Sequence, residues 1–488
     1  MANPVPPESR WTRRDAIGRS MGSFALICAL PSASSLTTTR TSGGMRAAAA
    51  AAATPFQGDL RILPTLVPVR RTAAEDHYEV TIQEGRAEIL PGTLTPIYGY
   101  DGIYPGPTIR VRKGRTAVVR QTNALPFVQN VHLHGAIAPA EFDGHPMDLI
   151  APGASFDYRY PNQQDAATLW YHDHAHGLSA RTMFYGLAGF YIVEDDFERA
   201  LGLPTGDFDV PLAIQDRAFD ANGALRYTED IDQGFLGDTI VVNGSVAPRF
   251  AVRRALYRLR LLNASNAREY RLQLADGGAM TQIAGDGGLL EAPVNRTAIG
   301  LGPAERIDVV VDFRRYKAGA QVVLRNALGD ATTTDVLRFD VTGKSTDSGR
   351  VPAQLRPREA IPAPVTTRRW ELMFSTAGAP QWQMSGIGFD MDRIDARPRL
   401  GTTERWLFVN RSHRLHPMHL HGVQFRVLER SSGGVPAWER AWKDTVMVGL
   451  DETVIVQPRF APYPGRFVFH CHNLEHQEKA MMLQMEVS

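Results

Sequence analysis

An internal repeat constrains the fold of this chain more than any other feature of its sequence. Near the start and again near the end, a strand-like segment leads into a His-Leu-His-Gly tetrapeptide. The segments are Gly114–Asn123 before His132–Gly135, and Thr403–Asn410 before His419–Gly422. Each copy then closes on a second His-x-His pair, His172 with His174 and His470 with His472. The repeat predicts two related structural units, one at each end of the chain.

The segment between the two copies carries related strand patterns but lacks their histidines. Tyr257–Asn263 and Pro303–Asp308 are similar to the strands of the repeat, whereas no histidine occurs between His176 and His413. The length of 488 residues is also enough for about three domains. We therefore predict three similar domains, with chemistry confined to the outer two, over residues 57–200, 205–350 and 360–488.

Most of the recognisable elements are short runs rich in Val, Phe and Trp, each bounded by Gly, Pro or Asn. Such runs indicate β-strands, and many strands at short spacing indicate β-sandwiches, so we expect an all-β fold. The predicted strands include Arg115–Gln121, Arg306–Phe313, Glu404–Asn410, Thr453–Pro458 and Arg466–Phe469. Two short helices are also predicted, Arg181–Leu187 and Asn473–Ala480.

Residues 1–56 read as a targeting segment and a linker rather than as part of the fold. Thr12–Arg14 places paired arginines before a mostly apolar stretch, Met21–Leu30, as in a twin-arginine export signal. Asp15 departs from the usual pattern, so a basic N-terminus without an export role is the alternative. Ala47–Ala53 is a low-complexity linker. We expect a protein exported to the periplasm or the extracellular space.

Net charge and hydropathy argue against two classes of partner. The formal net charge is +1, so no electrostatic attraction to nucleic acid or to an anionic membrane is expected. No apolar run reaches the ~20 residues that a membrane-spanning helix needs. We therefore expect a monomer whose partners are small molecules.

Most of the 14 histidines lie in clusters within the two outer regions. Side chains two residues apart on a strand point to the same face, so each His-x-His pair presents two imidazoles side by side. Pairs from both outer regions can meet at one interface and supply nitrogen ligands to metal ions. Imidazole binds copper, zinc, iron and nickel, so these pairs alone do not identify the metal.

A cysteine between two of the histidines narrows the choice of metal. Only Cys28 and Cys471 occur, and Cys28 lies in the apolar part of the predicted signal, so the mature chain has no internal disulfide. Cys471 stands between His470 and His472, and strand alternation directs its sulfur to the opposite face from both imidazoles. A buried thiol without chemical function is the alternative.

Two histidines and a methionine near this cysteine complete a copper ligand set. His416 precedes the second His-Leu-His, and His476 and Met481 follow Cys471 in the sequence. Two histidines, one thiolate and a weak axial methionine form the trigonal blue-copper electron-transfer centre. Zinc accepts such ligands but has no redox chemistry and gains nothing from a thioether. One strand is therefore predicted to touch two metal sites, a thiolate site on one face and a histidine site on the other.

In their combination and order, these motifs resemble those of the multicopper oxidase family from about residue 57 to the C-terminus. The motifs are His132-Leu-His134-Gly, Trp170-Tyr-His172-Asp-His174, His416-Pro-Met-His419-Leu-His421-Gly and His470-Cys471-His472-Asn-Leu-Glu-His476-Gln-Glu-Lys-Ala-Met481. The sequence around Asp143-Gly144 and in Trp442–Val446 is similar to bacterial three-domain laccases, bilirubin oxidases and copper-efflux oxidases. The resemblance implies three cupredoxin-like Greek-key β-sandwich domains that hold four copper ions.

The resemblance also implies a role for each ligand. His416, Cys471 and His476 would hold the type 1 copper, with Met481 as its axial ligand. His132 and His419 would hold the type 2 copper. The two type 3 coppers would be held by His134, His172, His174, His421, His470 and His472.

A family member of this kind takes single electrons from a small-molecule donor and reduces dioxygen to water. The resemblance implies that electrons pass through Cys471 to the two histidines beside it, and that protons reach the buried cluster through an acid. Asp143 occupies the position at which the family keeps such an acid. A carboxylate that caps the Asp143-Gly144 turn is the alternative.

The donor is less constrained than the chemistry. The 14 methionines are scattered and form no dense run of the kind that cuprous oxidases carry over the type 1 site. This favours a phenol, an aromatic amine or a bilirubin-like pigment as donor. Met384, Met391 and Met447 keep a cuprous or other metal-ion oxidase of copper tolerance as the alternative. A non-catalytic periplasmic scaffold of the same fold is a further alternative, although such proteins lack the ligands that this chain retains.

One position departs from the family's pattern. Related bacterial enzymes carry a glutamate directly after the second type 1 histidine, where it is thought to pass protons to oxygen, but this chain has Gln477 followed by Glu478. An amide neither donates nor accepts a proton under working conditions, so we predict oxygen reduction that is slower or differently pH-dependent than in relatives. Gln477→Glu should shift the pH profile of oxygen uptake, and an unchanged profile would count against a proton-transfer role at this position.

Overall fold

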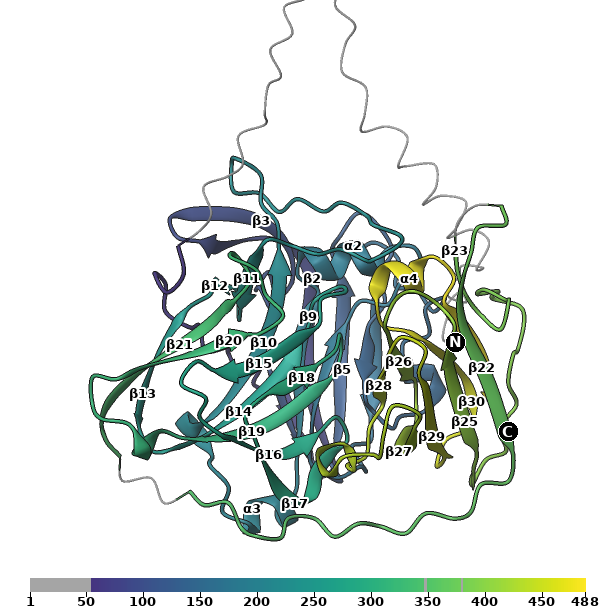
Figure 1. Cartoon of the computed structure of the whole chain (residues 1–488). Coiled ribbons are helices and arrows are strands. Elements are labelled where there is room, and N and C mark those ends of the chain that lie inside the picture. Colours follow the sequence, from purple (N-terminus) through teal and green to yellow (C-terminus); the bar gives the residue numbers. More distant parts are fainter. Residues whose placement is uncertain (1–53, 346–348, 379–380) are drawn as a thin grey trace, which may run out of the picture.

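The computed structural model describes residues 54–345, 349–378 and 381–488 (Figure 1). The predicted signal and linker therefore lie almost entirely outside the described residues. Within the described part strands predominate and the helices are short, as the sequence predicted. No helix of that part is long and apolar enough to cross a membrane.

The β-sheets form three pairs, one in each third of the chain. In every pair, apolar side chains from both sheets meet in a common core. In Figure 1 the second region lies on the left and the third region on the right. The prediction of an all-β fold built from sandwiches is confirmed, and the strands of each pair fall within 57–200, 205–350 and 360–488. The exact domain boundaries remain predictions.

The first region encloses a core that includes Val119 and Leu169. Buried and exposed side chains alternate along much of β2 because neighbouring residues face opposite sides of a strand. One sheet contains β1 (Arg70–Arg71), β2 (Glu75–Leu90), β3 (Thr93–Tyr100), β5 (Thr116–Asn123) and β7 (Ser155–Tyr160). The other contains β4 (Ile109–Arg112), β6 (His132–His134), β8 (Ala167–His172) and β9 (Ala188–Glu194).

The second region has the larger sheets and includes Leu60 in its core, although Leu60 precedes the strands of the first region. One sheet contains β10 (Asp209–Arg217), β11 (Thr239–Val242), β12 (Ser245–Val246), β14 (Leu256–Asn263), β16 (Met280–Gly285), β17 (Gly288–Arg296) and β19 (Arg306–Asp312). The other contains β13 (Arg249–Arg254), β15 (Tyr270–Leu274), β18 (Ile299–Leu301), β20 (Gln321–Asn326) and β21 (Asp335–Lys344).

The third region repeats the architecture of the first, and its smaller sheet carries the second set of histidines. The larger sheet contains β22 (Thr367–Ser375), β23 (Gln381–Met384), β24 (Thr402–Thr403), β25 (Arg405–Asn410), β27 (Gln424–Arg430) and β29 (Thr453–Phe460). The smaller sheet contains β26 (His416–Leu420), β28 (Thr445–Val448), β30 (Gly465–Cys471) and β31 (Met482–Val487).

The helices are short connections between strands. Two of them, α2 and α4, lie where the sequence predicted helices, and they contact each other although they come from the first and third regions. The α-helices of the described residues are α2 (Ser179–Tyr185), α3 (Asp196–Ala200) and α4 (Leu474–Glu478). The 3-10 helices are η2 (Ala140–Phe142), η3 (Gly206–Phe208), η4 (Phe313–Arg315) and η5 (Ala437–Glu439).

A buried network of ion pairs joins the first region to the second. Arg260 on β14 donates to both carboxylate oxygens of Asp209, at 2.6 and 3.0 Å. Arg258 donates to Glu198 of α3 at 2.7 Å and to Asp308 at 2.6 Å. Since every member has a partner of opposite charge, the network avoids the large cost of an unpaired buried charge.

Removing one carboxylate from this network should destabilise the protein. Burial alone would raise the pKa of Asp209, but Arg260 and Arg258 outweigh burial and lower this pKa to about 2. Its contribution to stability is therefore complete above the ordinary pKa of 3.8 and is lost as the pH falls toward about 2. We expect Asp209→Asn to lower the free energy of unfolding at neutral pH by ~3–5 kcal/mol, measured by urea denaturation.

An exposed ion pair provides the matched control. Asp157 pairs with Arg120 on the surface, where their side chains are 43% and 54% exposed. Asp157→Asn should cost less than ~1 kcal/mol. Equal losses in the two variants would contradict the interpretation that Asp209 compensates a buried charge.

Candidate metal centre

Buried imidazoles from the first and third regions meet between these regions. Because β6 pairs with β8 and β26 with β30, both antiparallel, His132 lies opposite His172 and His419 lies opposite His470. The predicted convergence of the His-x-His pairs is therefore present in the structure. The members of this histidine cluster are His132, His134, His172, His174, His419, His421, His470 and His472.

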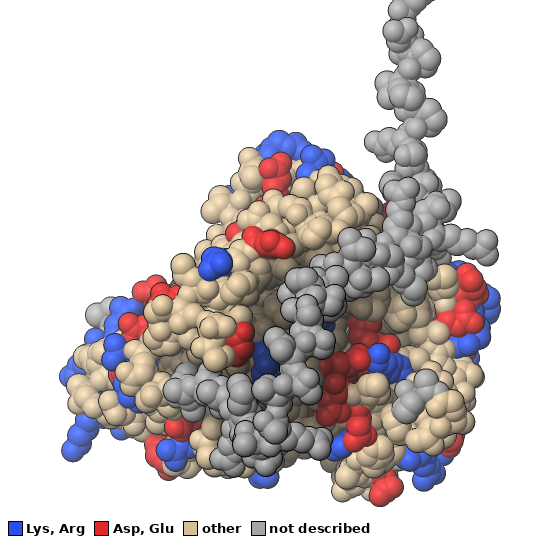
Figure 2. Space-filling view, turned by 90° about the horizontal axis from the view of Figure 1, so that it is seen from above, with Lys and Arg blue, Asp and Glu red and all other residues tan. Residues whose placement is uncertain are grey.

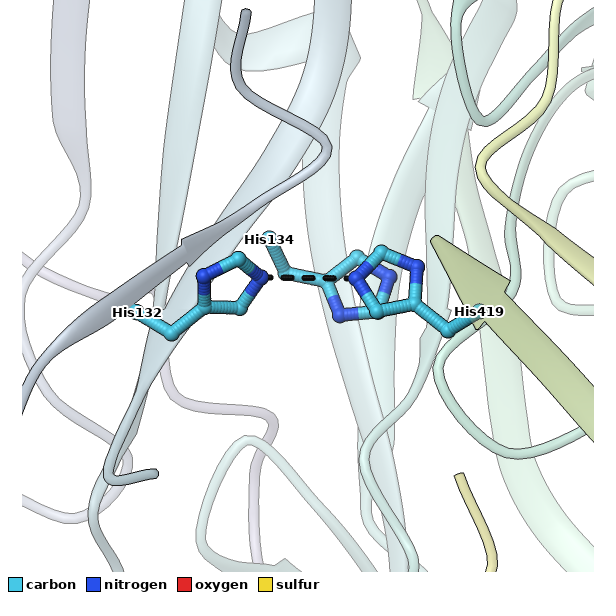
Figure 3. A group of neighbouring side chains, drawn as sticks. All are labelled: His132, His134 and His419. Carbon is cyan, nitrogen blue, oxygen red and sulfur yellow. Dashed lines mark hydrogen bonds between the residues drawn. The ribbon is translucent and has the colours of Figure 1, made fainter. Parts of the chain in front are cut away.

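The ring nitrogens form overlapping groups, in each of which the ligand atoms lie within 4.8 Å of one another. One group joins His132 and His134 to His419, with rings from both regions facing one another (Figure 3). Nε2 of His132 lies 3.4 Å from Nε2 of His419. The other groups are His134 with His172 and His472, and His174 with His421 and His470. Since His134 belongs to two groups, they form one cluster rather than separate sites.

Backbone carbonyls orient some of these rings through one nitrogen and leave the other nitrogen free for a metal. Nδ1 of His132 donates to the carbonyl of Asp143 at 2.5 Å, and Nδ1 of His470 donates to the carbonyl of Cys471 at 3.0 Å. A hydrogen bond of this kind fixes the orientation of a ligand ring and increases its basicity.

The cluster fits metal ions because its imidazoles are neutral. Burial and the neighbouring histidines hold the pKa of His132 and His134 well below the ordinary value. Burial also lowers the pKa of His172 to about 3 and that of His470 to about 4. Metal ions bind neutral imidazoles that have a free nitrogen. Buried nitrogens without a hydrogen-bond partner among the described residues are Nδ1 of His134, Nε2 of His172, Nδ1 of His174 and both nitrogens of His472.

A second group of buried ligand atoms surrounds the sulfur of Cys471. Sγ lies 3.5 Å from Nδ1 of His416 and 3.7 Å from Nδ1 of His476, and these two nitrogens are 3.4 Å apart. The three atoms form a nearly equilateral triangle, which is the arrangement of a trigonal copper site. Burial raises the pKa of the thiol well above its ordinary value, so a bound cation is needed to stabilise the thiolate.

The C-terminal turn brings the remaining predicted type 1 ligand to this group. The side chain of Asn473 caps α4 by accepting from the backbone N–H of His476 at 3.4 Å. The chain then turns back, so that the N–H of Cys471 donates to the carbonyl of Met481 at 3.0 Å. Met481 is fully buried in the core of the third region.

The alternation predicted for the His-Cys-His segment is present. Cys471 belongs to the triangle with His416, whereas His470 and His472 each belong to a different group of the histidine cluster. One strand end therefore connects the two ligand sets through a few covalent bonds.

Asp143 lies against the histidine cluster rather than at the surface. Its Oδ2 accepts from Nδ1 of His421 at 2.7 Å, and its carboxylate is 2% exposed. Its Oδ1 is buried and has no hydrogen-bond partner among the described residues. Burial raises the pKa of Asp143 well above its ordinary value.

Gln477 and Glu478 both face the segment that leads into α2. Nε2 of Gln477 donates to Oγ of Ser179 at 3.5 Å. Oε2 of Glu478 accepts from the backbone N–H of Gly177 at 2.5 Å, and burial raises the pKa of Glu478 to about 7. The sequence favoured a different direction for Glu478 than for Gln477, but the structure places both side chains against residues 177–179.

An aspartate that the sequence analysis did not select holds two of the histidines. Asp444 accepts from Nε2 of His134 at 2.9 Å through Oδ1, and its backbone carbonyl accepts from Nδ1 of His419 at 2.8 Å. Arg306 on β19, fully buried, donates to both carboxylate oxygens at 2.7 and 2.5 Å. The sequence indicated only that the segment Trp442–Val446 is similar to bacterial multicopper oxidases, and this similarity did not suggest a role for Asp444.

Side chains and backbone from two regions also surround His476. The ring of Trp382 stacks on the ring of His476 at 4.0 Å with an interplanar angle of 29°. Nε1 of Trp382 donates to the carbonyl of Ile231 at 2.6 Å, and Nε2 of His476 donates to the carbonyl of Asp232 at 3.0 Å. These contacts join residues far apart in the sequence, so no local pattern predicted them.

Removing the guanidinium of Arg306 should weaken both the fold and the retention of metal. Arg306→Gln leaves Asp444 buried without its counter-ion, so we expect a loss of ~3–5 kcal/mol in the free energy of unfolding. The copper content per purified chain should fall as well, because Asp444 orients His134 and His419. Arg325→Gln is the control, since Arg325 and Asp335 form a pair with 47% and 30% exposed side chains. Equal stability and copper content in the two variants would contradict this role of Arg306.

Comparison with known proteins matches the two histidine-bearing regions to one family. Family models described as multicopper oxidase match residues 81–198 and residues 364–488. A bilirubin oxidase of Albifimbria verrucaria is 39% identical over an alignment of 434 residues. The alignment covers 83% of this chain and 75% of that protein. A protein of Salmonella typhimurium named cell division protein FtsP is 34% identical over 431 residues, 84% of this chain and 89% of that protein.

Solved structures extend the similarity to the whole described fold. A laccase of Pediococcus acidilactici superposes with a TM-score of 0.83 at 34% identity, over 90% of this chain and 95% of that one. This agreement confirms the prediction of cupredoxin-like domains. The chain belongs to the multicopper oxidase family.

Proposed function

We propose that this protein is a laccase-like enzyme that couples one-electron oxidation of phenols or aromatic amines to four-electron reduction of dioxygen to water. The observation that carries the proposal is the position of Cys471, whose sulfur belongs to one ligand set while its two neighbours belong to the other. Electrons that arrive at the thiolate site thus have a short covalent route to the histidine cluster.

The ligand atoms suit four copper ions, which when bound would supply one-electron chemistry at one site and dioxygen binding at the other. His416, Cys471 and His476 would hold the type 1 ion together with Met481, which lies in the same core. His132 and His419 would hold the type 2 ion. The type 3 pair would lie between two sets of three, His134 with His172 and His472, and His174 with His421 and His470.

Asp143 is suited to deliver protons to the histidine cluster. Its raised pKa keeps the carboxyl protonated where an exposed carboxylate would be ionised, and Oδ1 is the atom without a partner among the described residues. A proton held at Oδ1 lies beside His421, which contacts the other carboxyl oxygen. General acids placed in this way contribute a factor of ~10²–10⁴ to a reaction rate.

Acidic side chains gather on the face of the molecule that carries α4. Figure 2 shows them beside a hollow on the upper face of Figure 1. Beside His476 itself the charges are balanced, because Asp232, whose carbonyl accepts from His476, pairs with Arg414 through its carboxylate.

A cuprous oxidase of copper tolerance is the second candidate, resting on Met384, Met391 and Met447. Met384 is fully buried in the core of the third region, so its thioether is not offered to an arriving ion. Met391 and Met447 are only half-buried, so the preference for an organic donor rests on the lack of a dense methionine run in the sequence.

A scaffold role is the third candidate, because the FtsP relative is named for cell division. The predicted histidine ligands form groups of three in which the ligand atoms lie within 4.8 Å of one another, and this argues against a scaffold, which has no need of neutral buried imidazoles. Export by the twin-arginine route and a monomeric state complete the proposal, with a small-molecule donor and dioxygen as partners and no nucleic acid.

Oxygen uptake by the copper-loaded protein, with a phenol and a cuprous salt as parallel donors, tests the proposal. We expect the phenol to drive uptake and the purified protein to be intensely blue. Cys471→Ser should remove the colour and reduce phenol-driven uptake to background, because the thiolate links donor and cluster. Asp143→Asn should keep the colour and lower uptake ~10²–10⁴-fold.

The control is Met482→Leu, which changes a buried side chain next to Met481 but keeps its volume. It should retain both colour and uptake. Uptake driven by the cuprous salt alone would replace the laccase proposal by the metal-oxidase one, and a colourless protein without uptake would leave the scaffold role.

A further inference from the structure

A cavity of about 240 Å³ lies between the second and third regions and contains none of the predicted copper ligands among the described residues that line it. β17 forms one wall, β27 and the segment around η5 form another, and the segment 356–359 that connects the two regions closes it. Figure 1 shows β17 at the bottom of the molecule with β27 to its right.

The most unusual group in this cavity is Arg426 of β27. The residue is 4% exposed, and its Nε is buried with no hydrogen-bond partner among the described residues. Its guanidinium carbon lies 4.6 Å from the ring centre of Trp442, and this ring also lines the cavity. Burial and the nearby Arg358 lower the pKa of Arg426. A buried guanidinium without a carboxylate is costly, because water is removed and no opposite charge replaces it.

The other buried arginines of the described residues have hydrogen-bond partners, and fully buried Arg217, which has no carboxylate partner, donates to the hydroxyl of Tyr104 and to the carbonyls of Asp216 and Met183. Arg260 and Arg306 each donate to both oxygens of an aspartate, and these carboxylates outweigh burial and raise the pKa of each guanidinium. Arg426 differs from them in making neither a hydrogen bond nor an ion pair with a residue that the structure describes, although Glu359 and Glu291 act on it from a longer distance. Its guanidinium is therefore available to an acceptor from outside the chain.

The remaining charges of the cavity leave it positive. Arg356 pairs with Asp165 and Asp195, Lys113 also pairs with Asp165, and Glu359 pairs with Arg459, so each of these two sets is neutral. Arg358 and Arg440 also line the cavity and form no ion pair with a described carboxylate, while Glu291 is the one lining carboxylate left over. Arg358, Arg426 and Arg440 against Glu291 give an excess of two positive charges.

We propose that this cavity binds a phosphate group, either inorganic phosphate or the terminal phosphate of a small phosphomonoester. A phosphate dianion matches the excess charge, whereas a single carboxylate would leave one guanidinium uncompensated. The planar donor fork of arginine also suits phosphate oxygens, which it binds through two parallel hydrogen bonds. The same positive charge excludes copper and other cations from this place.

The bound group would join two regions of the protein. Arg426 and Arg440 belong to the third region, and Arg358 belongs to the segment that links it to the second. A ligand that binds only the folded state raises stability by RT ln(1 + L/Kd), where L is its free concentration. Phosphate at concentrations above its Kd should therefore raise the melting temperature in step with the logarithm of its concentration.

Titration calorimetry of the copper-loaded full chain with inorganic phosphate, at constant ionic strength set by chloride, tests the site. We expect saturable binding of one phosphate per chain. Arg426→Gln should weaken it ~10- to ~100-fold, as expected for loss of a charge-assisted hydrogen-bonding partner. Arg358→Gln, an exposed substitution that leaves the core intact, should weaken it in the same direction.

The matched control removes a guanidinium from a neighbouring, larger cavity. Arg271 lies on β15 and lines that second cavity. Arg271→Gln should leave the phosphate affinity within about twofold, because sites without shared partners act independently. Equal weakening in all three variants, or none in Arg426→Gln and Arg358→Gln, would overturn the proposal in favour of non-specific attraction.

A second ligand distinguishes a phosphomonoester from free phosphate as the source of the bound group. Phenyl phosphate that binds as tightly as inorganic phosphate would assign the site to phosphomonoesters, and phenyl phosphate that fails to compete would assign it to free phosphate. In phosphate-free buffer Arg426→Gln should melt at the temperature of the natural protein or above it, because it removes an uncompensated charge. A lower melting temperature there would show that Arg426 has a purely structural role and would overturn the proposal.

Discussion

Burial of neutral imidazoles between two sandwiches is the constraint on which the rest of the structure depends. Placing the histidine cluster away from water holds its pKa values low, so the rings are available to a cation and cannot be protonated instead. Such a cluster needs walls on every side, and neither outer region supplies them alone. The repeat of strand pairs places β6 with β8 against β26 with β30, which closes the cluster from both sides.

The second region contributes no predicted ligand, yet it controls the position of the ligands. Arg306 reaches from β19 to Asp444 of the third region, and Asp444 in turn holds His134 of the first. A carbonyl of the second region likewise accepts from His476. The middle sandwich therefore fixes the outer two relative to each other. It positions the metal ligands although it contributes none of them.

The sequence predicted the parts of the site that depend on local spacing. The period of two in His-x-His and the placement of Cys471 between histidines follow from strand geometry, which is why their grouping was predicted and the structure agrees. Asp444, Arg306 and Trp382 were missed because their roles arise from contacts between residues far apart in the chain. The direction in which the side chains of Glu478 and Gln477 point depends on how α4 packs against α2, and no sequence periodicity determines this packing.

The buried arginines of the described residues are hydrogen-bonded, with Arg217 bound by neutral acceptors, and Arg426 departs from this pattern. Where Arg258, Arg260 and Arg306 leave water, carboxylates meet them, so folding brings each charge to its partner. Arg426 leaves water against an indole ring and no carboxylate. Such an arrangement costs free energy in the isolated chain, and a bound anion would offset part of that cost. The position of Arg426 at a boundary between regions means that an anion bound there would act on the same packing that orients the histidine cluster.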